Sequence, residues 1–117
     1  MNDDDRLILV QIVKFCEIIE NRIDEFSITS KLFQENAAYA DMLLLPVLQI
    51  GELANALSRE YVESCPEIPW HAISGFRNVI VHDYAIVDTQ WAWNTIEMDI
   101  PVLKKYVRDQ FERYSKP

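Results

Sequence analysis

The chain has 117 residues, of which 50% are apolar, 26% are charged and two are glycine. This composition indicates a single globular domain, residues 1–117, and excludes a disordered chain or a turn-rich β-sandwich. A net charge of −8 excludes binding to nucleic acid through an overall basic surface.

The first helix is expected from about Asp3 to Glu25. Acidic residues open this segment and suit a helix N-terminus, and Ser27 to Ser30 form a cap-like break after it. Apolar residues at spacings of three and four predict a buried stripe that consists of Ile8, Ile12, Phe15, Ile19 and Ile23.

A second helical region is expected from about Lys31 to Ser64. Pro46 should bend or divide it, because proline lacks a backbone donor and crowds the preceding turn. Cys65 to Pro69 is the clearest break in the chain. The candidate core positions of the region are Leu32, Phe33, Tyr39, Leu43, Val47, Ile50, Leu53 and Leu57.

The segment from Trp70 to about Tyr84 is ambiguous when taken alone. Residues 79–81 and 85–87 are rich in β-branched side chains and favour a strand. A lone strand would have no pairing partner in a chain whose other segments read as helices. We therefore expect a helix that ends near His82 to Tyr84.

Asp88 and Thr89 are expected to cap a last helix that continues to about Arg113 and is kinked at Pro101. The inward stripe of this helix would be Trp91 or Ala92, Ile96, Ile100, Leu103, Val107 and Phe111.

The sequence predicts a cytoplasmic protein. The N-terminus is acidic where a targeting segment would be basic, and apolar runs such as Met42 to Val47 are too short to span a bilayer. Cys16 and Cys65 form no C-x-x-C pair and have no zinc-ligand spacing, so we expect two reduced thiols.

The stretch from Arg77 to Tyr84 carries the chemistry of interest and reads R-N-x-x-x-H-x-Y. An arginine can clamp a phosphate, and a histidine can move a proton near neutral pH. Together they could cleave a phosphodiester without a metal ion. An Arg and a His at this spacing also occur by chance, and on spacing alone a structural histidine is the more common case.

Helical geometry divides the motif into two faces. At about 100° per residue, Arg77 and Tyr84 share one face, whereas Asn78 and His82 share another, where the amide could orient the imidazole. Arg77 and His82 differ by about 140°. A working site would need a frayed helix end at His82 or a second copy of the motif, which a two-fold dimer would supply.

Basic residues concentrate at the C-terminus. Residues 1–100 hold 17 acidic residues and six Lys or Arg, whereas residues 101–117 hold five basic and two acidic residues. The basic set could be a local handle for RNA together with Arg77, or simply cations that favour a helix C-terminus. It comprises Lys104, Lys105, Arg108, Arg113 and Lys116.

The wider stretch from Ile68 to Tyr84 resembles the signature of HepT-like HEPN proteins, which runs P-W, then G-x-R-N, then V-H-D-Y. Residues 49–52, Trp93 and residues 99–103 also look like that family. The resemblance covers about Leu7 to Val107. It implies an all-α, HEPN-type up-and-down bundle of four to five helices that forms a homodimer.

The resemblance further implies a metal-independent ribonuclease toxin without a cofactor, in which the motifs of two subunits meet in a cleft. Arg77 and His82 would be the catalytic pair, assisted by Asn78. The partner would be an MNT-type nucleotidyltransferase antitoxin that adenylylates Tyr84. The alternatives are a non-catalytic HEPN subunit that binds substrate for the nucleotidyltransferase, and a purely structural helical dimer.

Several neighbouring residues have two interpretations. Glu52, beside Gly51, either orients Arg77 or is an ordinary exposed carboxylate. His71 is expected to be structural. Trp91 and Trp93 are two residues apart, so one would be a core residue and the other a dimer-face aromatic, with base stacking as the less common alternative.

Overall fold

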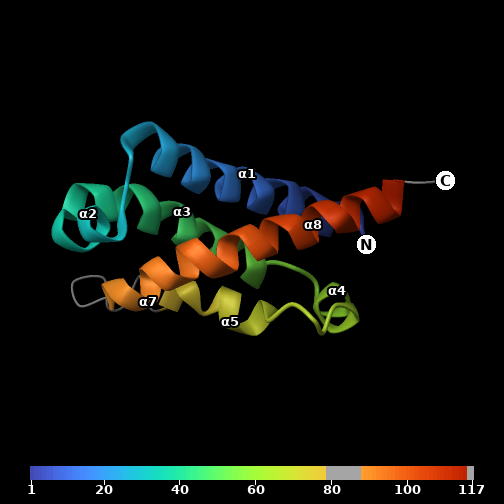
Figure 1. The fold of residues 1–117 in the computed structure, drawn as a ribbon. Helices are drawn as coiled ribbons and strands as arrows, with labels where there is room; N and C mark the ends of the chain where they lie inside the picture. Colours follow the sequence, from blue (N-terminus) through green and yellow to red (C-terminus); the bar gives the residue numbers. More distant parts are fainter. Residues whose placement is uncertain (79–87, 116–117) are drawn as a thin grey trace.

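The computed structural model describes residues 1–78 and 88–115, and the described part is helical without strands. Helix α1 (Asp3–Phe26), helix α3 (Ala37–Asn55) and helix α8 (Ile100–Ser115) are the long elements. Figure 1 shows them running side by side, with α2 (Ser30–Glu35) at one end and α4 (Arg59–Ser64) at the other. The predicted all-α fold is confirmed.

Helix α1 begins and ends as the sequence predicts. The side chain of Asn2 caps it by accepting from the backbone N–H of Asp5, and Ser27 ends it in the left-handed conformation, at φ 50°. The buried face is centred differently from the predicted stripe. Ile12 and Ile19 are buried as expected, but Leu9, Val13 and Cys16 complete that face, and Ile8, Phe15 and Ile23 lie at its edges.

The second helical region consists of three helices, and its divisions lie elsewhere than at Pro46. Asn36 ends α2 and caps α3, and Ser58 caps α4 after a break at residues 56–58. The side chains of both capping residues accept hydrogen bonds from backbone N–H groups that would otherwise lack partners.

Pro46 lies buried inside a continuous α3, so of the bend or division predicted there, the division is wrong. A proline at position 46 leaves the carbonyl of Met42, four residues earlier, without its helical donor. Arg22 of α1 donates to this carbonyl through Nη1 at 2.6 Å. The orphaned acceptor is therefore satisfied by a neighbouring helix, which allows α3 to continue.

Helix α3 is the centre of the bundle and packs against α1, α2 and α5 (Trp70–Ser74). By length and composition it is also the one helix in the described ranges that could cross a membrane, which the short apolar runs did not suggest. A core helix passes the same test, and 44% of the apolar window in α3 is buried inside the protein.

Asp88 directly precedes the last helical region, and its side chain caps α7 (Thr89–Asn94) as predicted. It then widens into a π-helical turn, η2 (Thr95–Asp99), before α8 begins. This turn ends two residues before Pro101, and a helix loses one backbone hydrogen bond at a proline because proline has no N–H group. The predicted inward stripe is buried from Ala92 to Val107, whereas Trp91 and Phe111 are half-buried.

Both cysteines are free and buried. Burial, its largest cause, raises the pKa of the Cys16 thiol to about 12. This thiol is therefore protonated near neutral pH, as expected of an inert core cysteine.

Candidate active site around Arg77

Arg77 follows a short helix that ends at a glycine. Helix α5 covers Trp70–Ser74, Gly75 forms a turn, and residues 76–78 are helical again. The predicted continuous helix from Trp70 is therefore interrupted at Gly75. Its predicted end near His82 to Tyr84 lies outside the described residues.

The loop before α5 is anchored to α8. Tyr106 donates its hydroxyl to Oε1 of Glu67 at 2.5 Å, and Gln110 donates to the same hydroxyl at 3.1 Å. The bond from Tyr106 lowers the pKa of the Glu67 carboxyl, because it stabilises the ionised form. Trp70 then places its ring in the core, where it is 2% exposed. These contacts set where α5 begins.

Gly51 brings the backbone of α3 against the segment that carries Arg77. A Cβ atom at position 51 would lie 2.9 Å from the backbone nitrogen of Arg77 and 3.2 Å from the carbonyl oxygen of Ile73. Only a glycine leaves room for this approach. Gly51 was part of the resemblance, but its role depends on a contact across 26 residues of sequence.

Glu52, the next residue of α3, holds the side chain of Arg77. Nε of Arg77 donates to Oε1 of Glu52 at 2.5 Å, and both side chains are about half exposed, at 44% and 45%. This contact supports the interpretation in which Glu52 orients Arg77 and is not merely an ordinary exposed carboxylate. The bond uses Nε, so the two terminal nitrogens of the guanidinium can still face an anion.

Phe76 fixes the same segment against α7 (Thr89–Asn94). Its ring is 7% exposed and meets Trp91 of α7 edge-on, with centroids 5.7 Å apart. Trp93 packs on Phe33 instead, at 5.5 Å. Both tryptophans are half-buried and pack against the core, and the predicted dimer-face role of one of them stays a prediction.

Of the other predicted site residues, only Asn78 lies within the described part of the chain. Asn78 is exposed next to Arg77, whereas His82 and Tyr84 lie outside the described residues. The shared faces of the motif and its completion by a second subunit therefore stay predictions. His71 is exposed on α5, so burial lends no support to its expected structural role.

The basic set at the C-terminus is mostly paired with acids. Lys104 contacts Glu20 at 2.8 Å and Arg108 contacts Glu17 at 2.6 Å, which ties α8 to α1. Lys105 contacts Asp109 within α8. Most of the cations proposed as a handle for RNA thus already have carboxylate partners.

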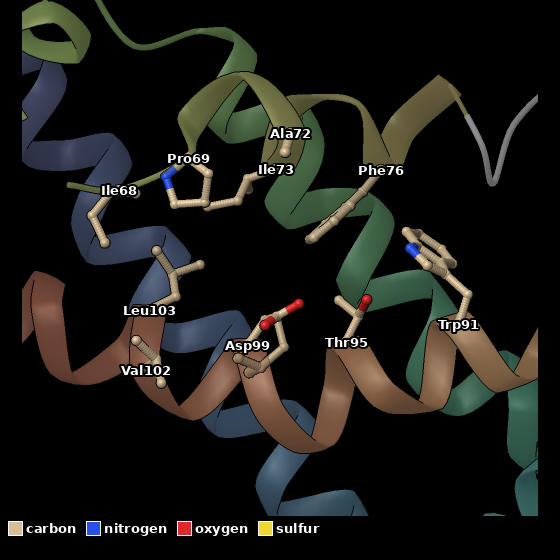
Figure 2. Close-up of a pocket in the computed structure, with 11 residues that line it drawn as sticks. Ile68, Pro69, Ala72, Ile73, Phe76, Trp91, Thr95, Asp99, Val102 and Leu103 are labelled. Carbon is tan, nitrogen blue, oxygen red and sulfur yellow. The ribbon is translucent and has the colours of Figure 1, made fainter. Parts of the chain in front are cut away.

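No group of three or more metal-ligating side chains occurs in residues 1–78 and 88–115. An apolar pocket lies beneath α5, on the side of Phe76 (Figure 2). This pocket was not predicted from the sequence. The feature of the sequence that could have indicated the pocket is Asp99, an acidic residue on the same helical face as the apolar Val102 and Leu103.

The described residues thus form a helical bundle that presents an oriented arginine, and the sequence that follows this arginine carries a histidine and a tyrosine. The Ribonuclease HepT-like family model matches residues 14–109, and the chain belongs to this family. No solved structure matches the chain.

Curated relatives carry ribonuclease names. "Probable ribonuclease HepT" of Thermococcus cleftensis is 30% identical over 108 residues, which cover 92% of this chain and 93% of that protein. A candidate RNase of Caldanaerobacter subterraneus is 28% identical over 105 residues, or 90% and 92% of the two chains. Another, of Methanocaldococcus jannaschii, is 26% identical over 95 residues, or 78% and 87%. The family and these names support ribonuclease activity.

Proposed function

We propose that this protein is a metal-independent endoribonuclease toxin of a type II HEPN/MNT toxin–antitoxin system. The observation that carries the proposal is the Glu52–Arg77 contact, because it presents a phosphate-binding group at the surface in a defined orientation. Family membership supplies the substrate class.

The reaction would use the nucleophile that RNA already carries. His82 would take the proton of the 2′-hydroxyl, whose oxygen attacks the adjacent phosphorus while the bond to the 5′-oxygen breaks. The leaving oxygen would receive a proton from the second subunit's histidine or from water. Arg77 would stabilise the charge that builds on the non-bridging oxygens. Asn78 would orient His82, and a homodimer would bring the two motifs together.

Substitution of the catalytic pair tests this function. Arg77→Ala and His82→Ala should each abolish RNA cleavage and relieve growth arrest, while the proteins stay folded. Arg59→Ala is the matched control, because Arg59 is also an exposed arginine in a carboxylate pair, with Glu63, and lies away from the site. Cleavage that persists in both site variants would refute the proposal.

Adenylylation of Tyr84 by an MNT-type nucleotidyltransferase would be the neutralising step. The hydroxyl would attack the α-phosphorus of ATP, lose its proton and release pyrophosphate. AMP on this residue would add bulk and negative charge on the helical face that Tyr84 is predicted to share with Arg77. Co-expression with the antitoxin should add AMP mass to the Tyr84 peptide, and Tyr84→Phe should stay unmodified and toxic. A neutralised toxin with an unmodified peptide would contradict this route.

The non-catalytic alternative is favoured by one observation. The chain carries a net charge of −8, and several C-terminal cations are already paired. A subunit that only positions substrate for a nucleotidyltransferase would need no RNA-binding surface. Purified protein that never cleaves RNA, yet raises the partner's activity on another substrate, would establish this alternative.

A further inference from the structure

The pocket beneath α5 is a cavity that the proposed catalytic mechanism does not use. It has a volume of about 330 Å³, at the lower end of the range for small-molecule sites. It lies between the segment 68–76 and the face of α7, η2 and α8 (Figure 2). Nine of its eleven lining residues are apolar, and the other two are Thr95 and Asp99.

Two features of the lining suit a flat aromatic ligand with a hydrogen-bond donor. Trp91 and Phe76 form one end of the pocket, and a half-buried tryptophan offers a face for stacking. Asp99 and Thr95 point into the space from η2, as Figure 2 shows. Asp99 is exposed and has no ion pair or hydrogen bond within the described ranges.

The pocket is adjacent in the chain to the proposed phosphate clamp. Phe76 lines the pocket, and the next residue, Arg77, is held outside it by Glu52 of α3. A nucleotide with its phosphate at Arg77 would therefore have an aromatic surface nearby for its base. Single-stranded RNA is recognised in this manner, by stacking together with hydrogen bonds to base edges.

We propose that this pocket binds an unpaired RNA base that carries an exocyclic amino group. The base stacks against Trp91, and its amino group donates to the carboxylate of Asp99, as cytosine N4 does to acidic side chains. The inference rests on the proposed ribonuclease function. It also explains how an acidic chain holds RNA, because stacking needs no basic surface.

A second copy of this chain fits the pocket less well. A two-fold interface centred here would bring two Asp99 carboxylates together. No Lys or Arg lines the pocket, and residues 79–87 contain none in the sequence. Two uncompensated carboxylates in an apolar interface repel each other and lose hydration. An amino group on a neutral base supplies the missing donor.

The test compares 2′-O-methyl oligocytidine with 2′-O-methyl oligouridine of equal length, since neither can be cleaved through a 2′-hydroxyl. Anisotropy of labelled oligomers should show about fivefold tighter binding of oligocytidine, the worth of one hydrogen bond. Asp99→Asn should bring this ratio to about one, because an amide can also donate to uracil O4. Glu97→Gln removes the same charge from the same turn, outside the pocket, and should keep the ratio.

The outcomes separate this inference from the proposed function. Equal binding of both oligomers by the unchanged protein, or a ratio unaltered by Asp99→Asn, would overturn the base pocket. So would a change of oligomeric state in Asp99→Asn with an unaltered ratio, which would make the pocket an interface between copies. A protein that cleaves no RNA but shows the expected ratios would keep the pocket and lose the proposed ribonuclease.

Discussion

The contact between Glu52 and Arg77 joins two half-exposed side chains, and such pairs add little to stability. Its consequence is geometric, because a flexible arginine is held in one direction before any substrate arrives. In the proposed ribonuclease, Glu52 would therefore be a positioning residue, which acts through Arg77 and not on the substrate itself.

Glu52→Gln should therefore lower RNA cleavage about tenfold and change the free energy of unfolding by less than about 1 kcal/mol. Glu63→Gln, which removes the exposed pair with Arg59, should have an equally small effect on stability and none on cleavage. Cleavage rates and thermal unfolding of the two variants provide the comparison. Equal cleavage in both would show that Glu52 does not position Arg77.

At the scale of elements, two contacts of α3 matter: one sets how closely the Arg77 segment approaches α3, and the other supports α3 at its proline. Gly51 allows the backbone of the Arg77 segment to approach α3, and Arg22 of α1 satisfies the carbonyl that Pro46 leaves without a donor. Both are interactions between helices, so each helix depends on its neighbour for its local geometry.

Gly51→Ala should destabilise the protein by about 1–3 kcal/mol, because its Cβ would press on the backbone nitrogen of Arg77 and the segment must move. Cleavage should fall as well, since Arg77 moves away from Glu52. Gly75→Ala is the control, because its nearest contact is 3.1 Å and its φ of −66° suits alanine. Denaturant unfolding should show a smaller change for Gly75→Ala, and equal changes would contradict the close-approach argument.

Arg22→Ala should cost about 1–3 kcal/mol of unfolding free energy, because it leaves the Met42 carbonyl without a donor. In a Pro46→Ala background the new backbone N–H can bond that carbonyl, so the same substitution should cost less. A double-mutant cycle by denaturant unfolding measures the difference. Equal costs in both backgrounds would show that Arg22 does not compensate for Pro46.

At the scale of the whole molecule, the chain has a net charge of −8, and ion pairs join its helices. Lys104 and Arg108 of α8 each contact a glutamate of α1, which links the two ends of the sequence. The loop before α5 is joined to α8 by the carboxylate of Glu67. Acid should weaken the contact of Glu67 with Tyr106 by protonating the Glu67 carboxylate.

The contact of Glu67 with Tyr106 should make the free energy of unfolding depend on pH in acid. Its folded-state pKa lies below the ordinary value of 4.5, chiefly because Tyr106 donates to it. The associated stability is present above pH 4.5 and is lost as the pH falls through the lowered pKa. Tyr106→Phe should flatten the dependence of unfolding free energy on pH below 4.5, whereas Tyr39→Phe should not. Parallel pH curves for Tyr106→Phe and the unchanged protein would contradict this assignment.

Much of the fold follows from local patterns. The acidic start of α1, the break at residues 27–30 and the cap at Asp88 depend on interactions within one turn of helix, and so they were predictable. The all-α fold followed from the scarcity of glycine and from the apolar spacing. The motif at residues 77–84 was likewise identified from its residue types and its neighbours.

Contacts between distant segments were decided by packing. The continuity of α3 through Pro46 depends on Arg22, which is 24 residues away, and the orientation of Arg77 depends on Glu52, 25 residues away. Glu52 had two interpretations in the sequence, because a carboxylate's role is set by the groups that folding brings within hydrogen-bond distance. The pairing of the C-terminal cations with α1 arises in the same way. Residue types and local periodicity therefore identify the helices and the candidate catalytic residues, whereas the geometry that makes a site of them exists only once α3, α5 and α8 are packed together.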